Sequence, residues 1–151
     1  MEKSILTLER GTCCTSWNFS GHRMAAGLAD GSVVVYDSTD PASSLLASSS
    51  RFKAVESSVS KIVWIPPEYG DAVACLGADG SLSLCEEFIA KAGDEPHWKI
   101  CYRFNTKKSR ILDLQFGDNR SHLKLVAAYS DGQIRIFQQV DSLELDKWQL
   151  Q

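Results

Sequence analysis

Short runs of apolar residues alternate with polar residues along much of the chain, with the two-residue period of half-buried β-strands. A clear example is ADGSLSLCEE at residues 78–87, where Leu82 and Leu84 alternate with serines directly after an Asp-Gly pair. The longer polar stretches between such runs show no sustained helical period. The pattern therefore predicts an all-β protein.

The Asp-Gly pair occurs three times, at Asp30-Gly31, Asp79-Gly80 and Asp131-Gly132, with spacings of 49 and 52 residues. The flanking residues agree when the three copies are superposed. Two and four residues after each glycine stand apolar side chains, namely Val33 and Val35, Leu82 and Leu84, and Ile134 and Ile136. Upstream of each pair, an aromatic residue closes an earlier apolar run, at Trp17, Trp64 and Phe116. We interpret these matches as an internal repeat of about 50 residues, typical of β-propeller blades.

Asp-Gly favours a two-residue type I′ hairpin turn, because glycine, asparagine and aspartate tolerate a positive φ. Each repeat is therefore expected to be a four-stranded antiparallel meander, whose more variable fourth strand falls at about 51–56, 97–104 and 146–151. Loops are expected at 38–50 and 86–96, and a flexible linker is the alternative for the serine-rich first stretch.

The expected domain is a single incomplete β-propeller over residues 1–151. Its three four-stranded antiparallel blades are placed at about 11–56, 57–104 and 105–151. A sandwich built from three hairpins is the alternative fold.

The composition is that of a soluble globular protein, with 44% hydrophobic and 23% charged residues. A net charge of −3 argues against a nucleic-acid surface, because only residues 107–110 are locally basic. The sequence shows no signal-peptide pattern and no apolar run of about 18 residues, so we expect an intracellular protein without membrane insertion. The five cysteines form no CxxC pair and are expected to be small buried hydrophobic residues.

No catalytic or metal-binding motif stands out, and no cofactor is expected. The three histidines, at 22, 97 and 122, lack metal-ligand spacing, and no nucleophile elbow or phosphate-binding glycine loop occurs. The innermost strands supply only Lys61 and Asp113 as charges. An enzyme with its active site in a propeller channel is therefore a remote alternative to a non-catalytic protein. The four tryptophans are expected to pack between blades.

The three repeats resemble WD repeats in the blocks WNFSGHRMAAGLADGSVVVYD, VSKIVWIPPEYGDAVACLGADGSLSLCEE and ILDLQFGDNRSHLKLVAAYSDGQIRIFQQ. The whole chain resembles the N-terminal part of the small propeller nucleoporins of the Y-shaped nuclear pore scaffold, in their plant form, most specifically at WIPPEYGDAVAC. The resemblance implies a non-catalytic scaffold at the nuclear envelope that supports transport of protein and mRNA. A vesicle-coat subunit, or a nutrient-sensing complex on lysosomes or vacuoles, is the alternative.

In WD repeats, the turn aspartate joins a buried hydrogen-bond network with a tryptophan and a histidine. The three aspartates match this pattern, but the tryptophan position holds Tyr36, Cys85 and Phe137, and Gly-His occurs only as Gly21-His22 within a loop. We therefore expect an incomplete network and blades held mainly by apolar burial. Cys85 in place of tryptophan would leave a cavity costing about 2 to 4 kcal/mol unless neighbouring side chains fill it.

The resemblance implies a ring of six blades, whereas this chain provides three. The outer faces of its first and last blades are expected to be apolar and exposed, as in a fragment, a dimer or a chain that binds a partner. The implied partner is an α-helical scaffold nucleoporin that donates a further blade. Its expected acceptor face lies on the first blade, at Cys13, Trp17, Val33, Val35 and Tyr36.

Overall fold

The computed structural model describes residues 7–38, 46–104, 108–118 and 121–151. Over these residues the chain forms twelve strands in three four-stranded antiparallel sheets, together with one 3-10 turn at Pro67–Tyr69. The expected all-β fold with three four-stranded antiparallel sheets is therefore confirmed.

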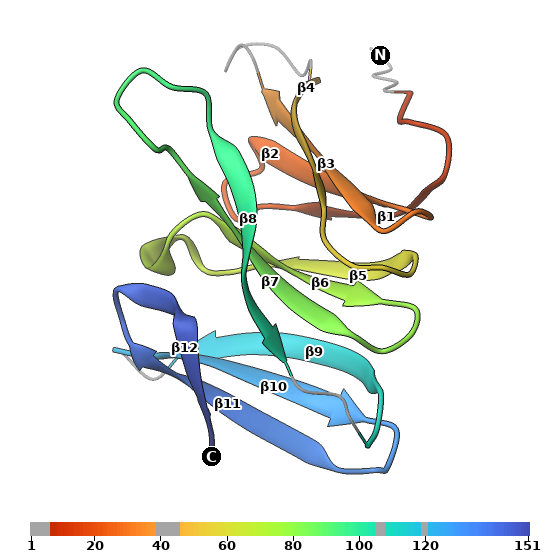
Figure 1. The fold of residues 1–151 in the computed structure, drawn as a ribbon, viewed down its shortest axis with the longest axis vertical. Helices are drawn as coiled ribbons and strands as arrows, with labels where there is room; N and C mark the ends of the chain where they lie inside the picture. Colours follow the sequence, from red (N-terminus) through yellow and green to blue (C-terminus); the bar gives the residue numbers. More distant parts are fainter. Residues whose placement is uncertain (1–6, 39–45, 105–107, 119–120) are drawn as a thin grey trace, which may run out of the picture.

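Each sheet is a meander in which strands that follow one another in the chain pair with one another. Blade 1 holds β1 (Thr12–Trp17), β2 (Arg23–Leu28), β3 (Ser32–Ser38) and β4 (Leu46–Lys53). Blade 2 holds β5 (Val59–Trp64), β6 (Ala72–Gly77), β7 (Leu82–Phe88) and β8 (His97–Phe104). Blade 3 holds β9 (Ile111–Asp118), β10 (Leu123–Tyr129), β11 (Ile134–Asp141) and β12 (Glu144–Leu150). The blades follow one another along the long axis of the molecule (Figure 1).

The burial of equivalent strands depends on the place of their blade in this stack. Every residue of β6 is buried, because blade 2 has a neighbouring sheet on both faces. In β10 the burial alternates instead, because only one face of blade 3 meets another sheet. One apolar cluster fills the space between blades 1 and 2, and a second fills the space between blades 2 and 3.

Several expected boundaries were wrong at the outer strands. β4 begins at Leu46 rather than at 51, so part of the serine-rich stretch is strand and not linker, while residues 39–45 lie outside the described residues. β7 continues to Phe88 into the expected loop, and β12 begins at Glu144. These strands lie at or beside the outer edge of a blade, where ladder hydrogen bonds can form without an apolar side-chain pattern to mark them.

The two outer faces of the stack differ, which corrects the expectation that both would be exposed. On blade 1, the outer face of β2 and β3 is buried, with Leu8 and Leu46 packed against it. Its buried residues are Met24, Ala26, Leu28, Val34 and Tyr36. On blade 3 the outer face is open, and Ile134 is 68% exposed.

Candidate protein-interaction surface

The three Asp-Gly pairs form equivalent turns between the second and third strands of each blade. The glycines all adopt a positive φ, at 90°, 85° and 84° for Gly31, Gly80 and Gly132. Each glycine donates its backbone N–H to a carbonyl three residues earlier, at Leu28, Gly77 and Tyr129. The expected type I′ turn is therefore wrong, because Asp-Gly does not occupy its two central positions. Each turn is centred on the aspartate and the residue before it, and the glycine closes a three-residue hairpin loop.

The carboxylates of the turn aspartates form hydrogen bonds within their own turns. Each carboxylate accepts the backbone N–H of the residue two positions later, at Ser32, Ser81 and Gln133, over 2.9 to 3.0 Å. This N–H lowers the pKa of Asp30 and Asp131, and for Asp79 the Ser81 hydroxyl lowers the pKa together with the N–H. These bonds fix the loop, so the structure gives the aspartates a turn-forming role at the surface.

The turns also connect each blade to its surroundings. The residue before each aspartate donates its N–H, over 2.8 Å, to the carbonyl that precedes the first strand of the same blade, at Gly11, Ser58 and Arg110. The Gly31 carbonyl accepts N–H groups from Ala54 and Val55, which lead into blade 2, and the Gly80 carbonyl accepts the N–H of Ile111. Blades 1 and 2 are therefore tied to the next blade at equivalent positions.

Cys85, where the WD pattern places tryptophan, lies in an apolar cluster that includes aromatic side chains. Cys85 is fully buried in the cluster between blades 1 and 2, which also contains Trp64. Phe52 and Trp98 pack against this cluster as a parallel stack with ring centroids 5.0 Å apart. Trp64 donates its Nε1–H to the Ser16 carbonyl over 2.9 Å, which joins β5 to β1.

Sequence reasoning missed a charged clamp between blades 1 and 2. Arg23 on β2 forms a two-pronged contact with Glu87 on β7, at 3.1 and 2.7 Å, and contacts Asp37 at 2.6 Å. Its guanidinium also lies 5.8 Å from the ring centroid of Trp64 and 5.6 Å from that of Trp98. Burial alone would lower the pKa of Arg23, but the hydrogen bonds to Glu87 and Asp37 raise it. The sequence offered one sign of this ion pair, which is an arginine at the start of an otherwise apolar strand.

The inner side of the stack carries an open cavity of about 510 Å³. Its lining comes from β1, β5, β9 and the outer face of blade 3, and includes Trp17, Phe19 and Ile134. The two charges predicted for this side, Lys61 and Asp113, form an ion pair with each other across blades 2 and 3. Hydrogen bonding from Lys61 lowers the pKa of Asp113. The pair therefore neutralises itself, which does not favour acid-base catalysis at this position.

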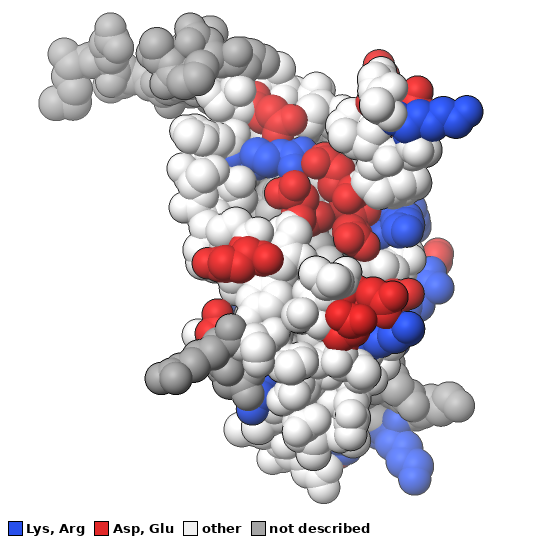
Figure 2. Space-filling view, turned by 90° about the vertical axis from the view of Figure 1, so that its left-hand side faces the viewer, with Lys and Arg blue, Asp and Glu red and all other residues white. Residues whose placement is uncertain are grey.

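The remaining residues considered for chemistry stay apart. Among the described residues, no group of three histidine, cysteine or acidic side chains is placed to hold a metal ion. Nor does that part of the chain contain a helix of the length and apolarity needed to cross a bilayer. In the basic stretch 107–110, Lys107 lies outside the described residues. Figure 2 shows acidic side chains gathered over the middle of one face with lysine and arginine around them, rather than a basic stripe.

The cysteines differ in burial, which corrects the expectation for one of them. Cys75 and Cys85 are buried, Cys14 and Cys101 are half-buried, and Cys13 is exposed. Burial, with a smaller contribution from Glu86, raises the pKa of Cys101 to about 12, and burial also raises the pKa of Cys14.

We therefore expect one of the five thiols to react promptly with a thiol reagent at pH 8 in the folded protein, and all five to react after denaturation. Because the pKa of Cys101 is about 12, raising the pH to 9 should not expose a second fast thiol. Mass spectrometry after brief labelling should find the adduct on Cys13. Prompt labelling of Cys75 or Cys85 would contradict the packing between blades 1 and 2.

The structure separates the residues expected to accept a partner. Val33 and Val35 are fully buried between blades 1 and 2, so they cannot contact a partner in this arrangement. Tyr36 is 7% exposed on the covered outer face of blade 1. Cys13 and Trp17 are accessible, and Trp17 is 52% exposed.

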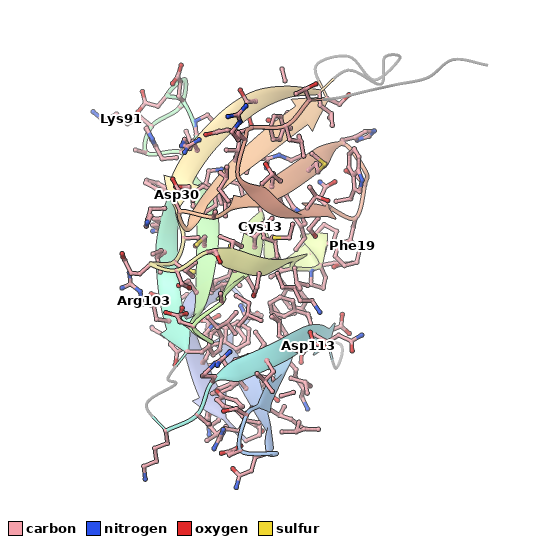
Figure 3. All side chains as sticks on the ribbon, turned by 90° about the vertical axis from the view of Figure 1, so that its right-hand side faces the viewer. Cys13, Phe19, Asp30, Lys91, Arg103 and Asp113 are labelled. Carbon is pink, nitrogen blue, oxygen red and sulfur yellow. The ribbon has the colours of Figure 1, made fainter. Side chains whose placement is uncertain are left out.

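Phe19, which the sequence interpretation overlooked, is 67% exposed just beyond β1. Figure 3 shows Phe19 and Asp113 toward one side of the molecule, with Asp30 and Arg103 toward the other. Trp17 and Phe19 are thus both exposed, and both line the cavity on the inner side of the stack.

No model of a known protein family matches the chain. It is 50% identical, over all 151 residues, to Protein SEH1 of Arabidopsis thaliana, and covers 46% of that protein. It is also 29% identical to Nucleoporin SEH1 of Danio rerio over 140 residues. This alignment covers 90% of this chain and 38% of the fish protein. The chain therefore spans less than half the length of these relatives.

Solved structures support the fold at much lower sequence identity. The β-propeller domain of Cps50 (Swd1) from Myceliophteria thermophila aligns with a TM-score of 0.65 at 11% identity, over 93% of this chain and 39% of that chain. The WD40 domain of SCAP from fission yeast aligns with a TM-score of 0.69 at 9% identity, over 95% of this chain and 32% of that chain. These likenesses show that the three blades have the WD40 propeller fold.

Proposed function

Because this chain is a relative of the SEH1 nucleoporins with a WD40 propeller fold, we propose that it is a non-catalytic scaffold component of the nuclear pore complex. The observation that carries the proposal is the 50% identity to the Arabidopsis protein over all 151 residues of this chain. The self-neutralised Lys61–Asp113 pair also favours a binding role over an enzymatic one. In this role the protein supports transport of protein and mRNA through contacts with other proteins at the nuclear envelope.

We also propose that an α-helical scaffold partner adds a sheet beside blade 1, at Cys13, Trp17 and Phe19. The equivalent of Trp17 in blade 2 is Trp64, which is 5% exposed and donates its indole N–H to the preceding sheet. Within the described residues no sheet precedes blade 1, and Trp17 is half-exposed. A donated sheet would give this indole the environment that Trp64 already has.

The first test is location. A fluorescently tagged chain expressed in Arabidopsis cells is expected to produce a continuous rim at the nuclear envelope and to co-purify with other nucleoporins. A signal at the vacuolar membrane would favour the nutrient-sensing alternative. A diffuse signal without co-purifying nucleoporins would contradict the proposal.

The second test separates the docking surface from the general scaffold role. Trp17→Asp is expected to reduce recovery of the helical partner at least about tenfold, because it places a charge in a contact that should be apolar. Leu143→Asp is the matched control, since Leu143 is 91% exposed at the far blade. Equal recovery with both variants would exclude blade 1 as the acceptor.

A further inference from the structure

Another cavity, of about 430 Å³, lies between blades 1 and 2, and we call it the interblade cavity. One wall is the connection from β4 to β5, at residues 54–56, and the other is formed by β7 and β8. Ala54, Val55 and Ile100 line it, and all three belong to the apolar cluster between these blades or pack against it. Its size is that of a pocket for a small molecule or a peptide side chain.

A comparison of the two interfaces between blades explains why this cavity exists. Ser83 lines it and stands three residues after the turn glycine of blade 2. Three residues after the turn glycine of blade 3 stands Arg135, which donates to the Ser109 hydroxyl over 3.3 Å and lies 4.0 Å from the Tyr129 ring centroid. Ser109 belongs to the connection from blade 2 to blade 3, so an arginine occupies the equivalent place at that interface. The interblade cavity is left where blade 2 has the shorter serine side chain.

The charged residues that line the interblade cavity have both signs. Arg103 pairs with Ser83 across β8 and β7, and Glu56 lies on the opposite wall. The side chains of Arg103 and Glu56 form no hydrogen bond or ion pair with each other or with any other described residue. The third charge, Lys53, donates to the Asp30 carbonyl. One unpaired cation and one unpaired anion therefore border the same apolar cavity.

We propose that the interblade cavity binds an extended peptide segment of a partner protein, in which an apolar side chain stands between an acidic and a basic one. The apolar side chain enters the cavity and packs on Val55 and Ile100. The acidic side chain binds Arg103, and the basic side chain binds Glu56. A nucleic acid or another phosphate-rich ligand is a poorer match, because Glu56 would repel its negative groups.

The cavity and the charges contribute differently to this recognition. Burial of the apolar side chain supplies most of the binding free energy. Arg103 and Glu56 are exposed, so their ion pairs add less free energy and mainly select which peptides bind. Figure 3 shows Arg103 and Phe19 toward opposite sides of the molecule, so the interblade cavity is separate from the proposed acceptor surface at Trp17 and Phe19.

Peptide binding to the purified chain, followed by fluorescence polarisation, tests the proposal. The probes are fluorescein-labelled Gly-Glu-Gly-Leu-Gly-Lys-Gly and the same peptide with glutamate and lysine exchanged. Alternate side chains share one face of an extended backbone, so all three can reach the interblade cavity. We expect saturable binding of at least one probe and loss of binding when its leucine is replaced by glycine. No saturable binding of either probe at about 1 mM would overturn the proposal.

Charge reversal tests the assigned contacts. Arg103→Glu should weaken binding of the mixed-charge peptide at least about fivefold, because an attraction becomes a repulsion. The same variant should prefer a peptide with two lysines, which a misfolded protein would not do. Lys91→Glu is the matched control, since Lys91 is exposed in the loop between β7 and β8 and does not line the cavity. Equal losses for Arg103→Glu and Lys91→Glu would contradict the assignment.

Filling the cavity tests its part in binding. Ser83→Arg should abolish peptide binding, because the longer side chain would occupy the space as Arg135 does at the next interface. Circular dichroism should show whether this variant folds, and if it does not, the preference of Arg103→Glu for the peptide with two lysines decides. Unchanged affinity in a folded Ser83→Arg variant would overturn the proposal. These outcomes do not depend on nuclear pore localisation.

Discussion

Gly31→Ala is expected to lower the free energy of unfolding by about 2 to 6 kcal/mol. The new Cβ atom would lie 1.9 Å from the Val55 carbonyl oxygen, which belongs to the backbone leading into blade 2 and cannot move aside alone. Steric overlap of this kind costs about 1 to 3 kcal/mol. A non-glycine residue at φ 90° adds about 1 to 3 kcal/mol. Urea-induced unfolding followed by tryptophan fluorescence measures the sum.

Gly132→Ala is the matched control for this variant. Gly132 closes the equivalent turn of blade 3 at φ 84°, but its added Cβ atom would meet no neighbour within 4 Å. Only the backbone strain remains, so the expected loss is about 1 to 3 kcal/mol. Equal losses for the two variants would show that the turn of blade 1 does not rest against the entry to blade 2.

Arg23→Met is expected to be the second large effect, with a loss of about 2 to 4 kcal/mol. The substitution leaves the Glu87 carboxylate, whose side chain is 15% exposed, without its two-pronged partner between blades. Removing one member of a buried ion pair costs more than the pair itself contributes, because the remaining charge stays desolvated. Thermal and urea-induced unfolding measure the loss.

A double variant and a surface control separate this effect from lost packing. Arg23→Met combined with Glu87→Met should recover most of the stability, since both charges are then replaced by apolar side chains. Lys61→Met should lower the free energy of unfolding by at most about 1 kcal/mol, because both side chains of the Lys61–Asp113 ion pair are exposed to solvent. A loss for Lys61→Met as large as that for Arg23→Met would contradict the assignment of Arg23 as an inter-blade clamp.

The repeat could be predicted from the sequence because its equivalent positions are apolar strand residues, which alternate with polar residues beside each Asp-Gly pair. Val33, Leu82 and Ile134 match in sequence because each occupies the same place in a blade. The expected exposure on the outer face of the last blade is confirmed at Ile134. The covered outer face of blade 1 could not be predicted, because Leu8 and Leu46, which pack on it, lie far apart in the sequence.

The turns and the clamp illustrate the local and the long-range limits of sequence interpretation. Asp-Gly correctly marked a tight turn with a positive φ at glycine, but the dipeptide occurs in more than one hairpin type. The hydrogen bond from Gly31 to Leu28 distinguishes the types, and it depends on strand register. The partnership of Arg23 with Glu87 spans 64 positions, so no local pattern indicates it.

The central claim is that three equivalent blades stack face to face, and nuclear Overhauser effects between neighbouring blades test it most directly. A Cβ atom on Gly27 would lie 2.5 Å from a Val59 methyl carbon, and one on Gly80 would lie 2.3 Å from the Arg110 Cβ. Strong cross-peaks are therefore expected from the Gly27 α-protons to the Val59 methyl groups, and from the Gly80 α-protons to the Arg110 β-protons. Their absence in a folded sample with intact strand pairing would contradict the stacked-blade structure.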